Sequence, residues 1–251
     1  MRARFLGKSI LLWINLLTFL LLFAEHGSCA EFVVSIFSGV TSAENNDLRL
    51  RQSGGTDLTF HDVSYKTHDW QSPIYYGGRV AYFPAKDAHW GVSLEFFHAK
   101  MYLNTEDTVR VTGTRAGAPV DAPERVGDTI TDFNISHGLN FLTANAMYRW
   151  FLAEREMNFL GRFQPYLGAG LGAAIPHVES TIGAVHFEQY QFRGPACQAM
   201  GGLNFDLSKH LGLFAEYKFT YADLDRLSIP NGSISLTPLT HHLATGISVR
   251  F

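Results

Sequence analysis

The chain has 251 residues, 46% of them hydrophobic and 14% aromatic, and its 20 basic and 23 acidic residues give a formal net charge of −3. This length fits a single all-β domain, and the acidic balance argues against nucleic-acid binding, which needs a basic surface. The two cysteines, Cys29 and Cys197, are too few for a disulfide framework.

The first 30 residues have the three parts of a secretory signal peptide. Arg2, Arg4 and Lys8 precede the apolar run SILLWINLLTFLLLFA, which is followed by the small residues of GSCA. We therefore expect cleavage after Ala30 and a mature domain over residues 31–251. The apolar run is longer than usual, so an uncleaved signal anchor is the alternative.

The mature chain contains segments in which apolar and polar or small residues alternate, as they do in β-strands. No apolar run approaches the ~18 residues that a membrane-spanning helix needs, so a membrane-embedded chain would have to be a barrel. The predicted strands are 32–40, 74–83, 90–103, 138–151, 164–175, 191–207, 212–221 and 239–251.

The connections between these strands alternate in length. Residues 84–89 and 208–211 are short and 152–163 moderate, whereas 41–73, 104–137, 176–190 and 222–238 are long and polar. Long outer loops and short periplasmic turns are typical of membrane barrels. The sequence thus predicts an all-β fold, an eight-stranded antiparallel up-and-down transmembrane β-barrel with long extracellular loops near 41–73 and 104–137.

The last strand, HHLATGISVRF, shows the expected facing most clearly. Leu243, Ile247 and Val249 share one parity, which we assign to lipid. Phe251 ends the strand, and we expect it at the periplasmic surface of the outer membrane. Aromatic residues near the strand ends are expected to form the two interfacial girdles. They are Tyr82, Trp90, Trp150, Phe205 and Phe251 at the periplasmic side, and Tyr76, Tyr102 and Tyr221 toward the outside.

The stretches PYLGAGLGAA, LFAEYKFTYADL and HHLATGISVRF resemble the eight-stranded outer-membrane barrels of the OmpA-like, OmpW-like and opacity-type superfamily. The resemblance implies the outer membrane of a Gram-negative bacterium and recognition of the strand ending in Phe251 by the barrel assembly machinery. The superfamily includes adhesins, anchors and small channels, so the resemblance leaves the activity open. The long first loop departs from the short-loop members.

Polar residues on the opposite parity are expected to fill the lumen. Charges there must be paired, because a buried charge without its partner costs about 3 to 5 kcal/mol. We expect Arg79 to pair with Glu95, and Glu216 with Arg250, while Lys218 and Arg149 share the remaining partners. Together with Asn145 these residues form the predicted polar network. The glycine row Gly168, Gly170 and Gly172 leaves space, which keeps a narrow channel open as an alternative.

An enzymatic function is the third alternative, because some outer-membrane barrels modify lipid A. Ser136 and His137 are adjacent, so their side chains point apart in a strand and cannot form an activating hydrogen bond. The loop stretch HDVSYKTHD lacks the tight ligand spacing of a metal site. No catalytic residue, cofactor or metal is therefore predicted.

The sequence as a whole predicts a non-enzymatic outer-membrane barrel with a plugged lumen and surface loops for interaction or adhesion. Its expected partners are the lipid bilayer, lipopolysaccharide and an unidentified extracellular partner. Lys100, Arg110 and Arg115 either contact lipopolysaccharide phosphates or form a solvated rim. A small-solute or hydrophobic-molecule channel and a lipid-A-modifying enzyme stay open as rival functions.

Overall fold

The computed structural model describes residues 30–153, 159–182, 185–192 and 194–251. Eight strands make up a closed barrel: β1 (Glu31–Ala43), β5 (Tyr76–Phe83), β6 (Trp90–Leu103), β9 (Asp132–Arg149), β10 (Phe163–Ile182), β12 (Pro195–Asp206), β13 (Leu211–Ala222) and β16 (Leu239–Arg250). The other described strands are β2 (Asn46–Gln52), β3 (Thr56–Val63), β4 (Tyr65–Lys66), β7 (Thr108–Arg115), β8 (Ala118–Arg125), β11 (Val185–Tyr190), β14 (Leu224–Ile229) and β15 (Gly232–Leu236). Two short 3-10 helices, η1 (Val126–Asp128) and η2 (Phe159–Arg162), complete the described elements.

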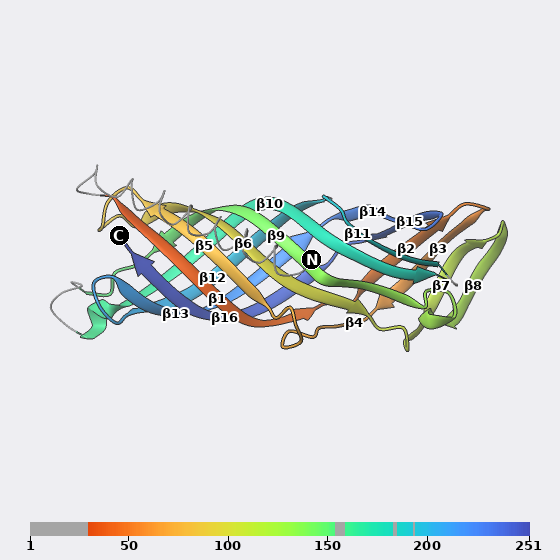
Figure 1. The fold of residues 1–251 in the computed structure, drawn as a ribbon, viewed down its shortest axis with the longest axis horizontal. Coiled ribbons are helices and arrows are strands. Elements are labelled where there is room, and N and C mark those ends of the chain that lie inside the picture. Colours follow the sequence, from red (N-terminus) through yellow and green to blue (C-terminus); the bar gives the residue numbers. More distant parts are fainter. Residues whose placement is uncertain (1–29, 154–158, 183–184, 193) are drawn as a thin grey trace, which may run out of the picture.

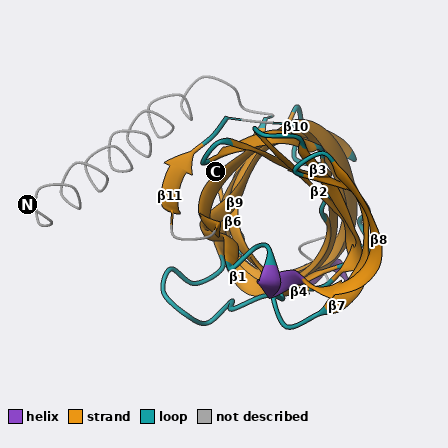
Figure 2. Ribbon diagram, turned by 90° about the vertical axis from the view of Figure 1, so that its right-hand side faces the viewer, coloured by secondary structure: helices purple, strands orange, loops and turns teal. Residues whose placement is uncertain are grey.

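The eight barrel strands close into a ring in which every neighbour is antiparallel. Following the pairing from β1 through β5, β6, β9, β10, β12, β13 and β16 returns to β1. The first and last strands meet in the register Val34 to Val249, and Figure 2 shows the ring from one end. Closure leaves no unpaired edge in the barrel. The predicted fold class is confirmed.

The alternating facing of the barrel strands is also as predicted. Leu243, Leu171 and Trp90 are exposed on the outside at 58%, 73% and 65%. The two neighbours of Leu243 on the opposite parity, His242 and Ala244, point into the lumen and are buried. Neither 3-10 helix in the described part of the chain is long or apolar enough to cross a membrane.

The prediction of long polar loops is wrong for most of their length. The connections between barrel strands form β-hairpins, and β14, β15, β2, β3, β7 and β8 assemble, in that order, into a second six-stranded sheet. Figure 1 shows this sheet at the right of the molecule, continuing the long axis of the barrel. We call it the extension. β9 and β10 are longer than predicted because their outer ends continue alongside it (Figure 1).

The interior of the extension is apolar. Leu48 and Leu50 of β2 and Leu58 and Phe60 of β3 are completely buried. They belong to one cluster with Phe133, Ile135 and Val178 from the outer ends of β9 and β10, and with Leu227 and Ile234 of the β14–β15 hairpin. Such a cluster removes a large apolar area from water, which is the main favourable contribution to folding. The hairpins are therefore folded elements rather than loops.

The exterior of the extension carries charges that are paired across neighbouring strands. Arg49 Nη2 lies 2.6 Å from Asp57 Oδ2, and Arg110 Nε lies 2.9 Å from Asp121 Oδ1. The hydrogen bond from Arg49 lowers the pKa of the Asp57 carboxyl below its ordinary value. At the edge of the sheet, the side chain of Gln191 bonds both the N–H and the carbonyl of Ser228 in β14, at 2.8 and 2.9 Å.

Candidate functional site

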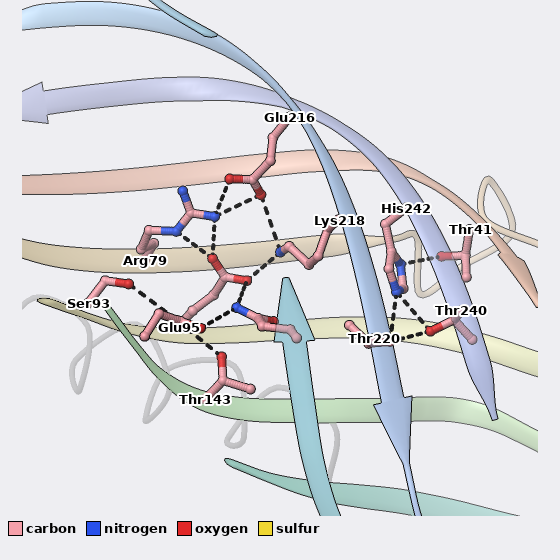
Figure 3. Close-up of polar contacts among 12 residues, drawn as sticks. Thr41, Arg79, Ser93, Glu95, Thr143, Glu216, Lys218, Thr220, Thr240 and His242 are labelled. Atoms are coloured by element: carbon pink, nitrogen blue, oxygen red, sulfur yellow. Dashed lines mark hydrogen bonds and ion pairs between the residues drawn. The ribbon is translucent and has the colours of Figure 1, made fainter. Parts of the chain in front are cut away.

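The lumen is crossed by four charged side chains that neutralise one another. Arg79 of β5 donates from Nε to Glu95 Oε2 at 2.5 Å and from Nη2 to Glu216 Oε2 at 2.6 Å. Lys218 of β13 binds Glu95 and lies 3.5 Å from Glu216. Figure 3 shows the four side chains converging in the lumen. We call them the upper quartet; each is at most 5% exposed.

Uncharged polar side chains form hydrogen bonds around the upper quartet. Tyr166 donates its hydroxyl to Glu216 at 2.8 Å. Gln198 donates to Asn145 at 2.7 Å, and Asn145 donates in turn to Ser93 at 3.2 Å. Buried charges are tolerated only when they are paired and hydrogen-bonded in this way.

A second group of four charges lies nearer the chain termini, and we call it the lower quartet. Arg149 pairs with Glu31, and Arg250 pairs with Asp206 and lies 3.7 Å from Glu31. The predicted pair of Glu216 with Arg250 is wrong. Glu216 belongs to the upper quartet, and Arg250 reaches Asp206 instead, because β12 supplies an acid that the sequence reasoning did not consider.

Aromatic rings pack in the lumen against the upper quartet. Lys218 Nζ lies 4.2 Å from the ring centre of Phe97 and 4.6 Å from that of Phe37, within the range of cation–π attraction. Phe97 stacks on Phe141 at 4.8 Å. Beside them, His242 contacts Thr220 at 3.2 Å and Thr41 at 3.2 Å (Figure 3). Phe37, Phe97 and Phe141 belong to the same buried cluster as the apolar core of the extension.

Side chains of neighbouring strands lie against the glycine row of β10. A Cβ at Gly170 would lie 2.0 Å from Asn145 Oδ1, and one at Gly168 would lie 2.8 Å from Met147 Sδ. The glycines therefore make room for side chains of the neighbouring strands. A cavity of about 60 Å³ separates the two quartets, with Tyr166, Phe214 and Gln164 in its wall.

The predicted lumen residues all lie inside the barrel. Arg79, Glu95, Asn145, Arg149, Glu216, Lys218 and Arg250 are buried at 5% exposure or less. Sequence reasoning missed Glu31, Asp206 and Tyr166, which the structure adds to the polar interior. His242, which lies on the parity opposite to the lipid-facing row of the last strand, is buried there as well. The inward facing of Asp206 and Tyr166 was readable from the sequence, because Asp206 has the same parity as Asn204 and Tyr166 the same parity as Gln164.

The predicted girdle residues occupy the outer wall near the strand ends. Trp90 is exposed at 65%, Tyr76 at 44% and Tyr82 at 39%. Trp150, Tyr221 and Phe251 are exposed between 36% and 38%, while Tyr102 and Phe205 are partly buried. Phe251 pairs with Phe32 through backbone hydrogen bonds, so the start of β1 and the end of the chain lie at the same end of the ring.

Three basic residues assigned to lipopolysaccharide or to a solvated rim each have a protein partner. Lys100 is buried and donates to the carbonyl of Gln71 at 2.8 Å. Arg110 pairs with Asp121, and Arg115 pairs with Glu124.

A second polar site lies on the outside of the barrel wall, and we call it the outer-face cluster. It consists of Tyr76, His98, Asn140, His177, Glu188 and Tyr190. His98 Nδ1 lies 2.9 Å from Asn140 Oδ1, and His177 Nε2 lies 3.3 Å from Glu188 Oε1. Sequence reasoning did not single it out, although His98 and Asn140 carry the parity assigned to lipid.

The remaining chemical hypotheses concern Ser136 with His137 and the stretch HDVSYKTHD. The side chains of Ser136 and His137 lie outside the described residues. His61 contacts Asp47 and Thr112, whereas His68 lies against Tyr102, so the two histidines of HDVSYKTHD serve different contacts. Within the described ranges no group of three His, Cys, Asp or Glu residues is arranged to hold a metal ion.

The sequence matches no known protein family and no curated protein. Similar solved structures include Neisserial surface protein A, with a TM-score of 0.41 and 14% identity over 88% of this chain and 99% of that one. The attachment invasion locus protein Ail of Yersinia pestis scores 0.36 at 16% identity, and a major outer membrane protein of Thermus thermophilus scores 0.44 at 11%, each over 88% of this chain and 99% of the other. At these low scores the barrel fold rests on the strand pairing of the chain itself.

Proposed function

We propose that the protein is an integral outer-membrane barrel with a sealed lumen, whose contacts with other molecules are made from its outer surfaces. The upper quartet carries this proposal. Two acids and two bases neutralise one another across the lumen, and a layer of phenylalanines lies directly above them. An interior of eight strands is just wide enough to be filled by side chains, in contrast to the water-filled pores of larger barrels.

The extension is the surface best suited to interaction. Its apolar core holds the hairpins in place, and its exterior presents cross-strand ion pairs on a folded sheet. A rigid scaffold of this kind can bind a partner with little loss of conformational entropy. We assign adhesion or surface recognition to the extension and no catalytic step to the lumen.

Single-channel recording in planar bilayers tests the sealed lumen. The full-length protein, purified from the membranes of an expressing strain, is expected to insert and to give no conductance steps. A variant with Arg79, Glu95, Glu216 and Lys218 all changed to Ala serves as the positive control, provided that it shows the same heat-modifiable band as the wild type. Reproducible steps from the wild-type protein would overturn the sealed lumen in favour of the channel.

A further inference from the structure

The outer face of three adjacent barrel strands changes from apolar to polar at a common height. On β6 the outward row Trp90, Val92, Leu94 continues into His98. On β9 the outward residue after Leu142 is Asn140, which pairs in register with His98 on one side and with Ile175 of β10 on the other. His177 stands one pleat above Ile175. These polar groups therefore border the apolar belt where the outer leaflet ends.

The inner part of the outer-face cluster is buried, although its residues point away from the lumen. His98 is 2% exposed, Asn140 7% and His177 5%. Asn140 Nδ2 donates to the carbonyl of Ile175 at 3.1 Å, so the amide is held in one orientation. Gly138 has a φ of +127°, and a Cβ there would lie 2.5 Å from His98 Nδ1. The backbone is thus shaped to leave room for the His98 and Asn140 side chains.

The rim of the cluster is accessible and aromatic. Tyr76 stacks on His98 with ring centres 5.0 Å apart and is 44% exposed. The ring of Tyr190 lies 4.1 Å from that of His177 and is 59% exposed. Half of the Glu188 side chain is exposed beside it. Figure 2 shows β11, which carries Glu188 and Tyr190, outside the ring of barrel strands. The exposed groups form an edge against which a molecule in the outer leaflet can lie.

We propose that the outer-face cluster binds the sugar headgroup of an outer-leaflet glycolipid. The cluster offers a carboxylate, an amide, imidazoles and phenols, which supply both donors and acceptors for a ligand rich in hydroxyl groups. Its exposed charge is the carboxylate of Glu188, which repels the negative charge of a phosphate and so disfavours binding through phosphate alone. The phenol rings provide apolar faces at the level where tyrosines meet headgroups in membrane proteins. In an outer membrane the glycolipid with this headgroup is lipopolysaccharide, so the inference rests on the proposed location.

Thermal unfolding and lipid retention test this site together. The full-length protein in detergent is mixed with lipopolysaccharide or with phosphatidylglycerol, and the shift in Tm and the glycolipid retained after washing are measured. The test variants are Glu188→Gln and Tyr190→Phe, whose side chains are half exposed and whose changes are isosteric or nearly so. Tyr221→Phe on the opposite wall is the matched control, because it also loses an exposed hydroxyl at the outer interface.

We expect lipopolysaccharide to raise the Tm of the wild type and of Tyr221→Phe, and phosphatidylglycerol to have little effect. Loss of one hydrogen bond to a charged group is expected to weaken retention by about tenfold in Glu188→Gln. Equal shifts with both lipids, or unchanged retention in both test variants, would overturn the site. Conductance of the barrel would overturn the sealed lumen without affecting this result, so the two proposals fail separately.

Discussion

The barrel and the extension are both built from antiparallel strands joined by hairpins, yet the apolar side faces outward in the barrel and inward in the extension. In the barrel the interior holds the two charged quartets and the exterior is apolar, as at Leu243 and Leu171. In the extension the interior is apolar, as at Leu50 and Phe60, and the exterior carries ion pairs. The face that carries apolar residues depends on what surrounds each region. Within single strands such as β6, apolar residues pass from the outward face to the inward face.

The exchange is visible along β6 and β9. Inward residues of β6 pass from Glu95 to Phe97 and Met101, while outward residues pass from Leu94 to His98. Pairing continues on both sides of this boundary, and the register shifts at β9 between Ile135 and Leu139, where Gly138 has a positive φ. The outer-face cluster lies at this boundary, where the outward face first becomes polar.

The largest effect is expected from removing one member of the upper quartet. Lys218→Met leaves Glu95 and Glu216 with Arg79 alone, and an uncompensated buried charge is expected to cost about 3 to 5 kcal/mol of unfolding free energy. Urea unfolding in lipid vesicles measures the loss. The double variant Glu95→Gln with Lys218→Met keeps one acid and one base, so it should lose less; equal losses would show that the quartet does not act as a balanced unit.

The second-largest loss of stability is expected when a core side chain of the extension is shortened. This loss should be confined to the extension. Leu58→Ala removes a completely buried side chain, and we expect a loss of about 2 to 5 kcal/mol in the local stability of the extension. Hydrogen exchange of β2 and β3 should accelerate while that of β16 is unchanged. If β16 accelerates equally, the two regions unfold as one cooperative unit.

A charge on the lipid-facing wall should cost slightly less. Leu243→Arg is expected to lower the stability of the barrel by about 2 to 4 kcal/mol near mid-bilayer. The same arginine at Thr108, which is exposed on the extension, should change stability by less than about 0.5 kcal/mol. Urea titrations of the two variants refolded into vesicles compare their stabilities. Similar losses of stability at both positions would contradict the claim that the barrel wall faces lipid while the extension faces water.

The smallest effect is expected at the surface of the extension. Asp57→Asn breaks the ion pair with Arg49, and a half-exposed pair of this kind contributes at most about 1 kcal/mol. Because Arg49 lowers the folded-state pKa of Asp57, this stabilisation is present above the ordinary pKa of the carboxyl and is lost as the pH falls through the lowered value. Wild type and variant should therefore converge in Tm at acidic pH. A difference in Tm that grows on acidification would show that the folded state raises the pKa of Asp57 instead of lowering it.

The barrel could be predicted because lipid forces a strict alternation that single strands display. The strand from Trp90 to Leu103 has the predicted bounds for this reason. The hairpins of the extension were not recognised, because segments such as NDLRLRQ carry short apolar alternations among many polar residues. Their apolar residues become a core only when several hairpins assemble. Parity shows that Arg250 points into the lumen, but it does not show which acid lies close enough to pair with it. That depends on the three-dimensional arrangement of the lumen side chains.

The opposite facing of the two regions can be tested most directly by placing single cysteines along β16 and β3, in a background with Cys29 and Cys197 both changed to Ser, and attaching a fluorophore to each. The account predicts quenching by nitroxide-bearing lipids at positions 243, 245 and 247 of β16. At positions 57, 59 and 61 of β3, it predicts quenching by aqueous iodide and none by the lipids. Quenching by lipid at β3, or by iodide at the three β16 positions, would contradict the claim that the two regions face different solvents.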